Sequence, residues 1–130
     1  MVRNVILLIA LALVLCGCSG SKSNGEDSGS MKYELQSVHG VNGRQGICVE
    51  GDYYWVSGST TLTKYDRDWN VVAENTDPFK GYALEVNHIG DIDVFDGEIY
   101  CGVELFLDGV AKNIQIAVYD VKTLQFVRAF

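Results

Sequence analysis

The sequence has little proline and no cluster of basic residues. Its 130 residues include one proline, and 10 lysines and arginines stand against 17 aspartates and glutamates, giving a net charge of −7. Proteins that bind nucleic acid neutralise its phosphates with clustered basic residues, so no nucleic-acid partner is expected. With 48% hydrophobic residues the chain is too apolar to be disordered or collagen-like, and it has room for one small folded domain.

No apolar run is long enough to cross a bilayer as a helix. The unbroken run Val5–Leu15 has 11 residues. At 1.5 Å per residue it would cover about 16 Å of a hydrocarbon core that is roughly 30 Å thick. The run follows a single positive charge at Arg3, which is the layout of a signal peptide. The sequence therefore predicts a segment that directs export and is then removed.

The end of this run, Leu15-Cys16-Gly17-Cys18, resembles the bacterial lipobox. The resemblance implies cleavage after Gly17, a diacylglyceryl thioether on Cys18 and acylation of the new amino terminus with palmitate-type chains. Ser19 stands where an aspartate would favour retention at an inner membrane, so the resemblance places the protein in the cell envelope, at the outer membrane, or on the outer face of the cytoplasmic membrane. The alternative is an ordinary secretory signal with two incidental cysteines.

Three segments follow from these features. Residues 1–17 are the expected lipoprotein signal peptide, and residues 18–30 are the lipidated cysteine with a tether of serine, glycine and other polar residues. Such a composition buries nothing, and a tether of about 12 residues reaches roughly 20 Å. Residues 31–130 are expected to form the folded domain.

The periodicity of the folded domain is that of β-strands. β-branched and aromatic residues form short runs broken by glycine, aspartate and asparagine, and no window shows a convincing helical pattern. An all-β domain is therefore predicted. Eight strands are expected, in two sets of four preceded by a further strand near 33–38: 45–50, 52–57, 61–66 and 71–75, then 90–95, 98–103, 114–120 and 126–130.

The two sets of four align as an internal repeat of 45 to 54 residues, with blade one at about 39–76 and blade two at about 86–130. Glu50-Gly51-Asp52 matches Asp96-Gly97-Glu98, and Tyr65-Asp66 matches Tyr119-Asp120. The extra length of the second copy lies at 104–113, around the turn Asp108-Gly109. Four strands per repeat at this spacing resemble the blades of bacterial extracellular β-propellers, among them NHL-type proteins, glutaminyl cyclotransferase-like proteins and calcium-dependent lactonases.

Two four-stranded antiparallel blades make an incomplete ring, because propellers close with at least four. We expect either the front part of a longer propeller interrupted after Phe130 or several copies that self-associate through exposed blade edges. A small β-sandwich is the alternative fold.

Several polar residues are expected near the mouth of a propeller channel. His88 and Asp91 are the candidate catalytic residues of a propeller-class hydrolase or cyclotransferase, and Asn87, Asp93 and Glu104 are candidate ligands of a metal, for which oxygen donors suit calcium. Turn-adjacent residues of these types commonly bind their own backbone instead, as expected for Asp108.

The remaining cysteines, Cys48 and Cys101, are expected to be buried free thiols without a disulfide, because they fall in different repeats. No Gly-x-Ser-x-Gly motif is present. The sequence therefore favours a membrane-anchored binding module for a ligand or protein over an enzyme, with no cofactor unless it is calcium.

Overall fold

The structure is a computed structural model that describes residues 32–130. Residues 37–130 form one compact unit, and the fold described below is the fold of that unit. The expected signal peptide, the lipidation site Cys18 and the tether at 18–30 lie outside the described residues.

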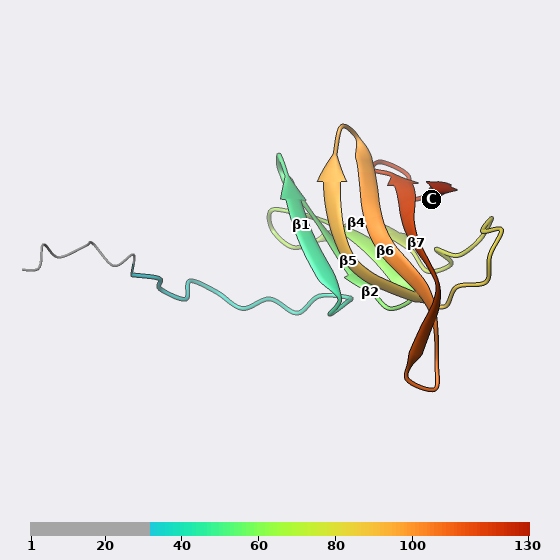
Figure 1. Cartoon of the computed structure of the whole chain (residues 1–130). Helices are drawn as coiled ribbons and strands as arrows, with labels where there is room; N and C mark the ends of the chain where they lie inside the picture. Colours follow the sequence, from blue (N-terminus) through green and yellow to red (C-terminus); the bar gives the residue numbers. More distant parts are fainter. Residues whose placement is uncertain (1–31) are drawn as a thin grey trace, which may run out of the picture. The chain divides into compact units, whose positions relative to one another are not determined.

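Residues 32–130 contain eight strands and no helix. Sheet A consists of β1 (Gly46–Glu50), β2 (Tyr53–Gly58), β3 (Thr61–Asp66) and β4 (Val71–Asn75). Sheet B consists of β5 (His88–Phe95), β6 (Glu98–Leu107), β7 (Val110–Asp120) and β8 (Phe126–Ala129). Each sheet is an antiparallel meander in chain order, and β1 lies beside β5 (Figure 1). The all-β prediction and the division into two sets of four strands are confirmed.

The additional strand predicted near 33–38 is wrong. No strand forms there, and the apolar side chains of Tyr33, Leu35 and Val38 are all exposed. Alternation of polar and apolar residues predicts a strand only where the apolar side has a sheet face or core to cover.

The turns explain why the chain reverses where it does. Gly51 in the β1–β2 turn has a φ of 57°, and Asp96 and Gly97 in the β5–β6 turn have φ values of 51° and 78°. Such positive φ values suit glycine and aspartate, which is why these residues mark hairpins in the sequence. The longer β6–β7 hairpin reverses at Asp108, with a φ of 52°, and Gly109, with a φ of 77°, as predicted.

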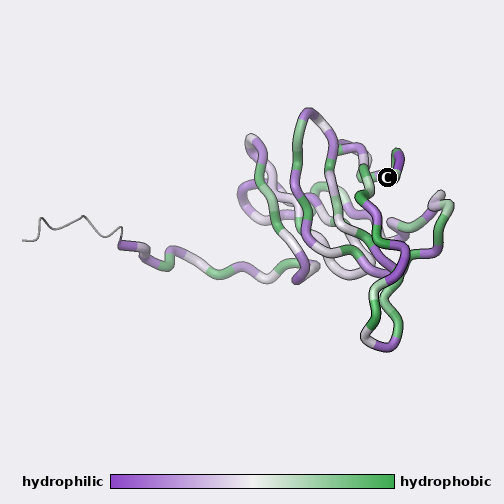
Figure 2. The backbone as a smooth tube through the Cα atoms, viewed as in Figure 1, coloured by the Kyte–Doolittle hydropathy of each residue, from purple (hydrophilic) through white to green (hydrophobic). Residues whose placement is uncertain are grey.

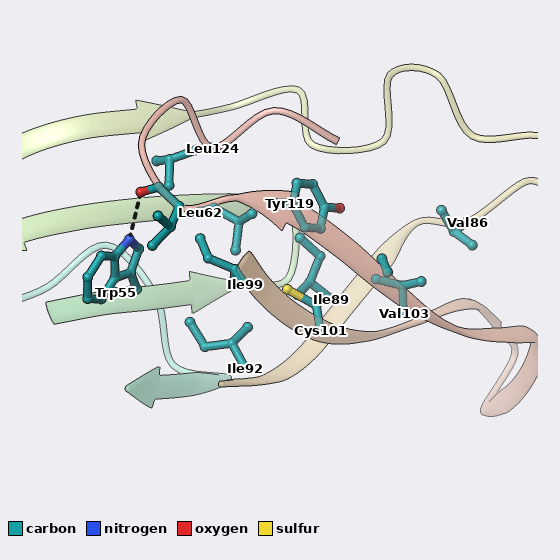
Figure 3. Close-up of a cluster of buried hydrophobic side chains, with 12 residues drawn as sticks. Trp55, Leu62, Val86, Ile89, Ile92, Ile99, Cys101, Val103, Tyr119 and Leu124 are labelled. Carbon is teal, nitrogen blue, oxygen red and sulfur yellow. Dashed lines mark hydrogen bonds between the residues drawn. The ribbon is translucent and has the colours of Figure 1, made fainter. Parts of the chain in front are cut away.

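One hydrophobic core lies between the two sheets (Figure 3). Sheet A contributes Trp55 and Leu62, and sheet B contributes most of the remaining side chains. Burying one such large apolar side chain stabilises the fold by about 1.5–3 kcal/mol. The core cluster comprises Trp55, Leu62, Val86, Ile89, Ile92, Ile99, Cys101, Val103, Ala117, Tyr119, Val121 and Leu124.

The pairing registers fix which residues of the two sheets correspond. The β1–β2 hairpin closes at the pair Glu50–Tyr53, and the β5–β6 hairpin closes at Phe95–Glu98, so these strands correspond at an offset of 45 residues. Matching the turns by their glycines, as the sequence suggests, gives 46 and is wrong by one residue. The error arises because glycine is the first turn residue in one hairpin and the second in the other.

A one-residue difference in register moves a side chain to the opposite face of a sheet. At the observed offset, Trp55 corresponds to Tyr100, because both stand two residues beyond the closing pair. Trp55 is packed in the core, whereas Tyr100 alternates with the core residues Ile99 and Cys101 and lies on the other face of sheet B. The packed face of sheet A therefore corresponds to the open face of sheet B, and the sheets are stacked head to tail.

The other two faces obey the same relation. Tyr65 of sheet A corresponds to Tyr119 of sheet B, because each stands just before the aspartate that ends its strand, Asp66 or Asp120. Tyr119 faces the core, and Tyr65 lies on the outer face of sheet A. Both hydroxyls are held by the segment that precedes their sheet: the Asn42 backbone N–H donates to Tyr65 at 2.7 Å, and Tyr119 donates to the Pro78 carbonyl at 3.1 Å.

Candidate functional site

The start of β5 and the neighbouring part of β6 bring together two of the residues predicted from sequence, His88 and Glu104. The Nδ1 atom of His88 lies 3.0 Å from Oε1 of Glu104, and both side chains are about three-quarters buried. The ring of Phe106 lies 6.1 Å from the imidazole. Within residues 32–130, Glu104 is the hydrogen-bond partner of the His88 side chain, so the carboxylate orients the imidazole as a supporting group would in an active site.

Asn87 is bound to backbone rather than free to take a ligand. Its amide donates to the Phe106 carbonyl at 3.0 Å, and its side-chain oxygen accepts from the Phe106 N–H at 2.7 Å. Its own backbone N–H donates to the Glu104 carbonyl at 3.0 Å. Asn87 thus continues the pairing of β5 with β6 by one further residue, which stabilises the base of the long β6–β7 hairpin.

The two aspartates of β5 also bind their own backbone. The carboxylate of Asp91 accepts from the N–H of Ile92 at 2.9 Å, and that of Asp93 accepts from the N–H of Val94 at 2.8 Å. Asp91 lies in an irregular part of β5, where the register with β6 shifts between Ile89 and Ile92. The carboxylate that His88 contacts is therefore Glu104 and not Asp91, so the structure does not pair the two catalytic candidates.

The predicted metal ligands are not gathered into one site. Asp93 pairs across the sheet with Tyr100, and Glu104 pairs with His88. Tyr100 and Glu104 are four residues apart on β6, which corresponds to about 13 Å along a strand. No group of three or more histidine, cysteine, aspartate or glutamate side chains that could hold a metal ion occurs in the described part of the chain. Calcium binding stays a prediction without a ligand group there.

The β6–β7 hairpin projects beyond the other strands of sheet B (Figure 1). Its outer part is apolar on both strands and polar at the Asp108-Gly109 turn (Figure 2). Phe106, Leu107 and Val110 are each about half exposed. The sequence predicted the turn and the extra length of the second repeat, but not that the added residues would be exposed apolar side chains. An exposed apolar group of this kind is a feature of surfaces that bind a partner.

The outer face of sheet A is partly covered by the residues that precede β1. A hollow of about 260 Å³ lies there, lined by Val41, Gly43, Arg44, Gln45, Gly46, Ile47 and Val56. The lining is almost wholly apolar apart from the exposed side chains of Arg44 and Gln45. Ile47 and Val49 of β1 remain exposed beside it.

The open face of sheet B carries exposed apolar side chains around one strong ion pair. Phe95, Ile116 and Phe130 are exposed. The guanidinium of Arg128 donates to both carboxylate oxygens of Glu98, at 2.6 and 2.7 Å. These hydrogen bonds from Arg128, together with one from Tyr100, lower the pKa of Glu98 to about 2. The face is therefore mixed, with an apolar area and a fixed, bidentate charge pair.

Three aromatic side chains form a stack on the outer face of sheet A. The Trp69 ring lies between Tyr54, at a centroid distance of 4.4 Å, and His39, at 4.7 Å. Both contacts are nearly parallel, with interplanar angles of 8° and 14°. His39 therefore packs against tryptophan, and the stack leaves neither main face of Trp69 open to a ligand.

Cys48 and Cys101 are free thiols in the structure. Burial is the main cause that raises the pKa of each to about 12, and the carboxylates of Asp93 and Asp91 add to the effect at Cys48. Both thiols are thus protonated at neutral pH, which makes them poor nucleophiles. They pack against the core as small apolar side chains.

Comparisons with known proteins do not identify a family. No protein-family model matches the chain, and no curated protein matches it. Among solved structures, the crystal structure of a computationally designed protein, Ika4, is similar over 77% of this chain and 80% of its own, with 15% sequence identity and a TM-score of 0.37. Residues 32–130 contain no helix that is long and apolar enough to cross a membrane.

Proposed function

We propose that the protein is a membrane-anchored extracytoplasmic lipoprotein whose folded unit is a β-propeller segment that binds a ligand or another protein. The observation that carries the proposal is the head-to-tail stacking of the two sheets, in which the packed face of sheet A corresponds to the open face of sheet B. Successive propeller blades stack in this sense. Two halves of a sandwich that face each other in the same way would bury corresponding faces instead.

The anchor is proposed from the lipobox-like residues Leu15-Cys16-Gly17-Cys18. Two or three acyl chains meet the requirement of two signals for stable membrane attachment. The experiment compares the full-length chain with Cys18→Ser and with the matched control Cys16→Ser. We expect Cys18→Ser to abolish acylation and membrane attachment, whereas Cys16→Ser stays in the membrane fraction. Mass spectrometry of membrane-extracted protein is expected to show an acylated peptide that begins at Cys18. An unmodified amino terminus at another residue would refute the anchor.

A binding role is favoured over chemistry by the surroundings of His88. Its imidazole is oriented by Glu104, but no hydroxyl or thiol within residues 32–130 forms a hydrogen bond with it, and both free thiols are held protonated. A base without a neighbouring nucleophile does not make a covalent mechanism. The apolar hairpin around Phe106, Leu107 and Val110 offers a contact surface directly beside this pair.

The His88–Glu104 pair is also the observation that supports the alternative, a propeller-class hydrolase or cyclotransferase. The discriminating assay incubates protein lacking residues 1–18 with esters, lactones and peptides that begin with glutamine. The binding module predicts no turnover and no change with His88→Ala. Turnover that is lost in His88→Ala but kept in the control His39→Ala would establish the enzyme instead. Calorimetric titration with Ca²⁺ tests the metal-dependent form, for which heat and thermal stabilisation are required.

A further inference from the structure

The open face of sheet B and the outer face of sheet A, which is exposed along β1 but buried at Val56 and Tyr65, correspond to two faces that are already packed together inside the molecule. We infer that the open face of sheet B in one copy of this chain docks on the outer face of sheet A in a second copy. The partner is thus the same chain, because the contact would continue the existing junction between the sheets. The inference goes beyond the proposed binding function and depends on neither the anchor nor a ligand.

The acceptor side of this contact is the part of the outer face of sheet A that lies along β1, since Val56 and Tyr65 of β2 and β3 are already buried. Its residue Ile47 corresponds to Ile92 of sheet B. Ile47 stands three residues before Glu50, and Ile92 stands three residues before Phe95, which are the first residues of the two closing pairs. Ile92 is covered by sheet A and is 6% exposed, whereas Ile47 has no such cover and is 56% exposed. The apolar hollow beside Ile47 is open for the side chains of a docking sheet.

The donor side is the open face of sheet B. Its residue Ile116 pairs with Gly102, as Leu62 pairs with Ser57 in sheet A, so Ile116 corresponds to Leu62. Leu62 is packed against sheet B and is 1% exposed, whereas Ile116 is 54% exposed. The apolar character needed for packing is therefore kept at the corresponding position, while the covering sheet is absent.

A hydrogen bond within the molecule predicts which residues meet between copies. The Ser57 hydroxyl donates to the Gly90 carbonyl at 2.8 Å. Ser57 corresponds to Gly102 at the offset of 45, and Gly90 lies in the irregular part of β5 between Ile89 and Ile92, at the place that Gln45 and Gly46 take beside Ile47 in β1. Gly102 of one copy therefore lies against the segment 45–46 of the next, where Gln45 is the exposed position that can carry a cysteine for a disulfide. Because donor and acceptor faces differ, the contact is heterologous and generates a ring or an open series.

The test is disulfide formation between copies of the protein lacking residues 1–18, in which Cys48 and Cys101 are the native cysteines, followed on non-reducing gels. The variants are Gln45→Cys, Gly102→Cys and the double variant. Both positions accept cysteine: Gln45 is exposed, and a Cβ at Gly102 meets nothing within 4 Å. The native thiols Cys48 and Cys101, whose pKa is about 12, give little background.

The double variant is expected to give a ladder of dimers and larger species, and each single variant alone is expected to stay monomeric. Co-expression of the two single variants is expected to give dimers that do not extend. The inference is overturned if the double variant stays monomeric, or if either single variant dimerises as strongly as the mixed pair, since that result would mean a symmetric contact.

Sedimentation of protein lacking residues 1–18 provides the second measurement. This form keeps the whole compact unit 37–130 and its core. Its average mass is expected to rise with concentration, and Ile47→Asp or Ile116→Asp is expected to abolish the rise. Leu84→Asp in the segment between β4 and β5 is the control, because Leu84 is 51% exposed and lies in neither sheet. A monomer at high micromolar concentration, or an equal effect of Leu84→Asp, would overturn the inference.

Discussion

Replacing Gly46 with alanine is expected to destabilise the protein because β1 approaches β5 too closely for a side chain at this position. The new Cβ would lie 2.7 Å from the backbone N of Ile92 and 2.9 Å from the Cα of Asp91. The Ile92 nitrogen would have to retreat by about 0.7 Å to reach an ordinary contact of 3.4 Å. Overpacking of this kind costs about 1–3 kcal/mol.

The measurement is urea unfolding followed by the fluorescence of buried Trp55 and by circular dichroism. For a unit of this size each kcal/mol lost lowers the melting temperature by roughly 4–8 °C. Gly102→Ala is the matched control, because a Cβ there meets no atom within 4 Å. It is expected to leave the free energy of unfolding unchanged or to raise it slightly, since alanine reduces the entropy of the unfolded chain.

Two results would refute this reasoning. One is an equal effect of Gly46→Ala and Gly102→Ala, which would mean that the sheets are not in close contact at β1 and β5. The other is complete rescue of Gly46→Ala by Asp91→Ala. The Asp91 side chain can move or be removed, but the backbone of Ile92 cannot, so only a small part of the loss is expected to return.

Three further predictions follow from single contacts. Because hydrogen bonds from Arg128 lower the pKa of Glu98 from 4.5 to about 2, the stabilisation by this pair is complete above pH 4.5 and is lost as the pH falls toward 2. The free energy of unfolding, measured across that pH range, is expected to fall less steeply with decreasing pH in Glu98→Gln than in the unchanged protein. An equal slope in the two proteins would contradict this prediction. Trp55→Phe removes the indole hydrogen bond to the Val121 carbonyl and leaves a gap in the core, so it is expected to lower the free energy of unfolding by about 2–4 kcal/mol. The control Trp69→Phe, at a half-buried position, is expected to lower it clearly less. Equal losses in the two variants would contradict the packing of Trp55 between the sheets. Gly109→Val forces a β-branched residue to a φ of 77°, and hydrogen exchange is expected to increase at 105–112 but not in sheet A; an increase throughout both sheets would show that the hairpin is not a separate element.

The strands could be predicted because short alternating runs and Asp-Gly turns are local signals. The correspondence of the two sheets could not, since it depends on which residues close each hairpin. Glycine takes the first turn position at Gly51 and the second at Gly97, and aligning them shifts every later residue by one. That shift would match Trp55 to Cys101, which also faces the core. The two packed faces would then wrongly correspond to each other, and the head-to-tail stacking would not be recognised.

The surroundings of the candidate site needed the structure for a related reason. His88 meets Glu104 because the register of β5 and β6 is displaced at Gly90 and Asp91, and such an irregularity leaves no periodic trace in the sequence. The sequence identified His88 and Asp91 as catalytic candidates and Glu104 as a candidate metal ligand, without predicting the contact between His88 and Glu104. The backbone hydrogen bonds of Asn87 could be anticipated only as the general tendency of asparagine near turns.

The central claim is that sheet A covers sheet B with the face that carries Trp55, while the corresponding Tyr100 of sheet B lies on an open face. Nuclear Overhauser contacts in protein that begins at Ser19 test it most directly. We expect the Trp55 indole N–H to contact protons of Val121 and Leu124, since it donates to the Val121 carbonyl at 3.3 Å, and we expect the Tyr100 ring to contact no residue of sheet A. Contacts from Tyr100 to Leu62, with none from Trp55 to sheet B, would contradict the account.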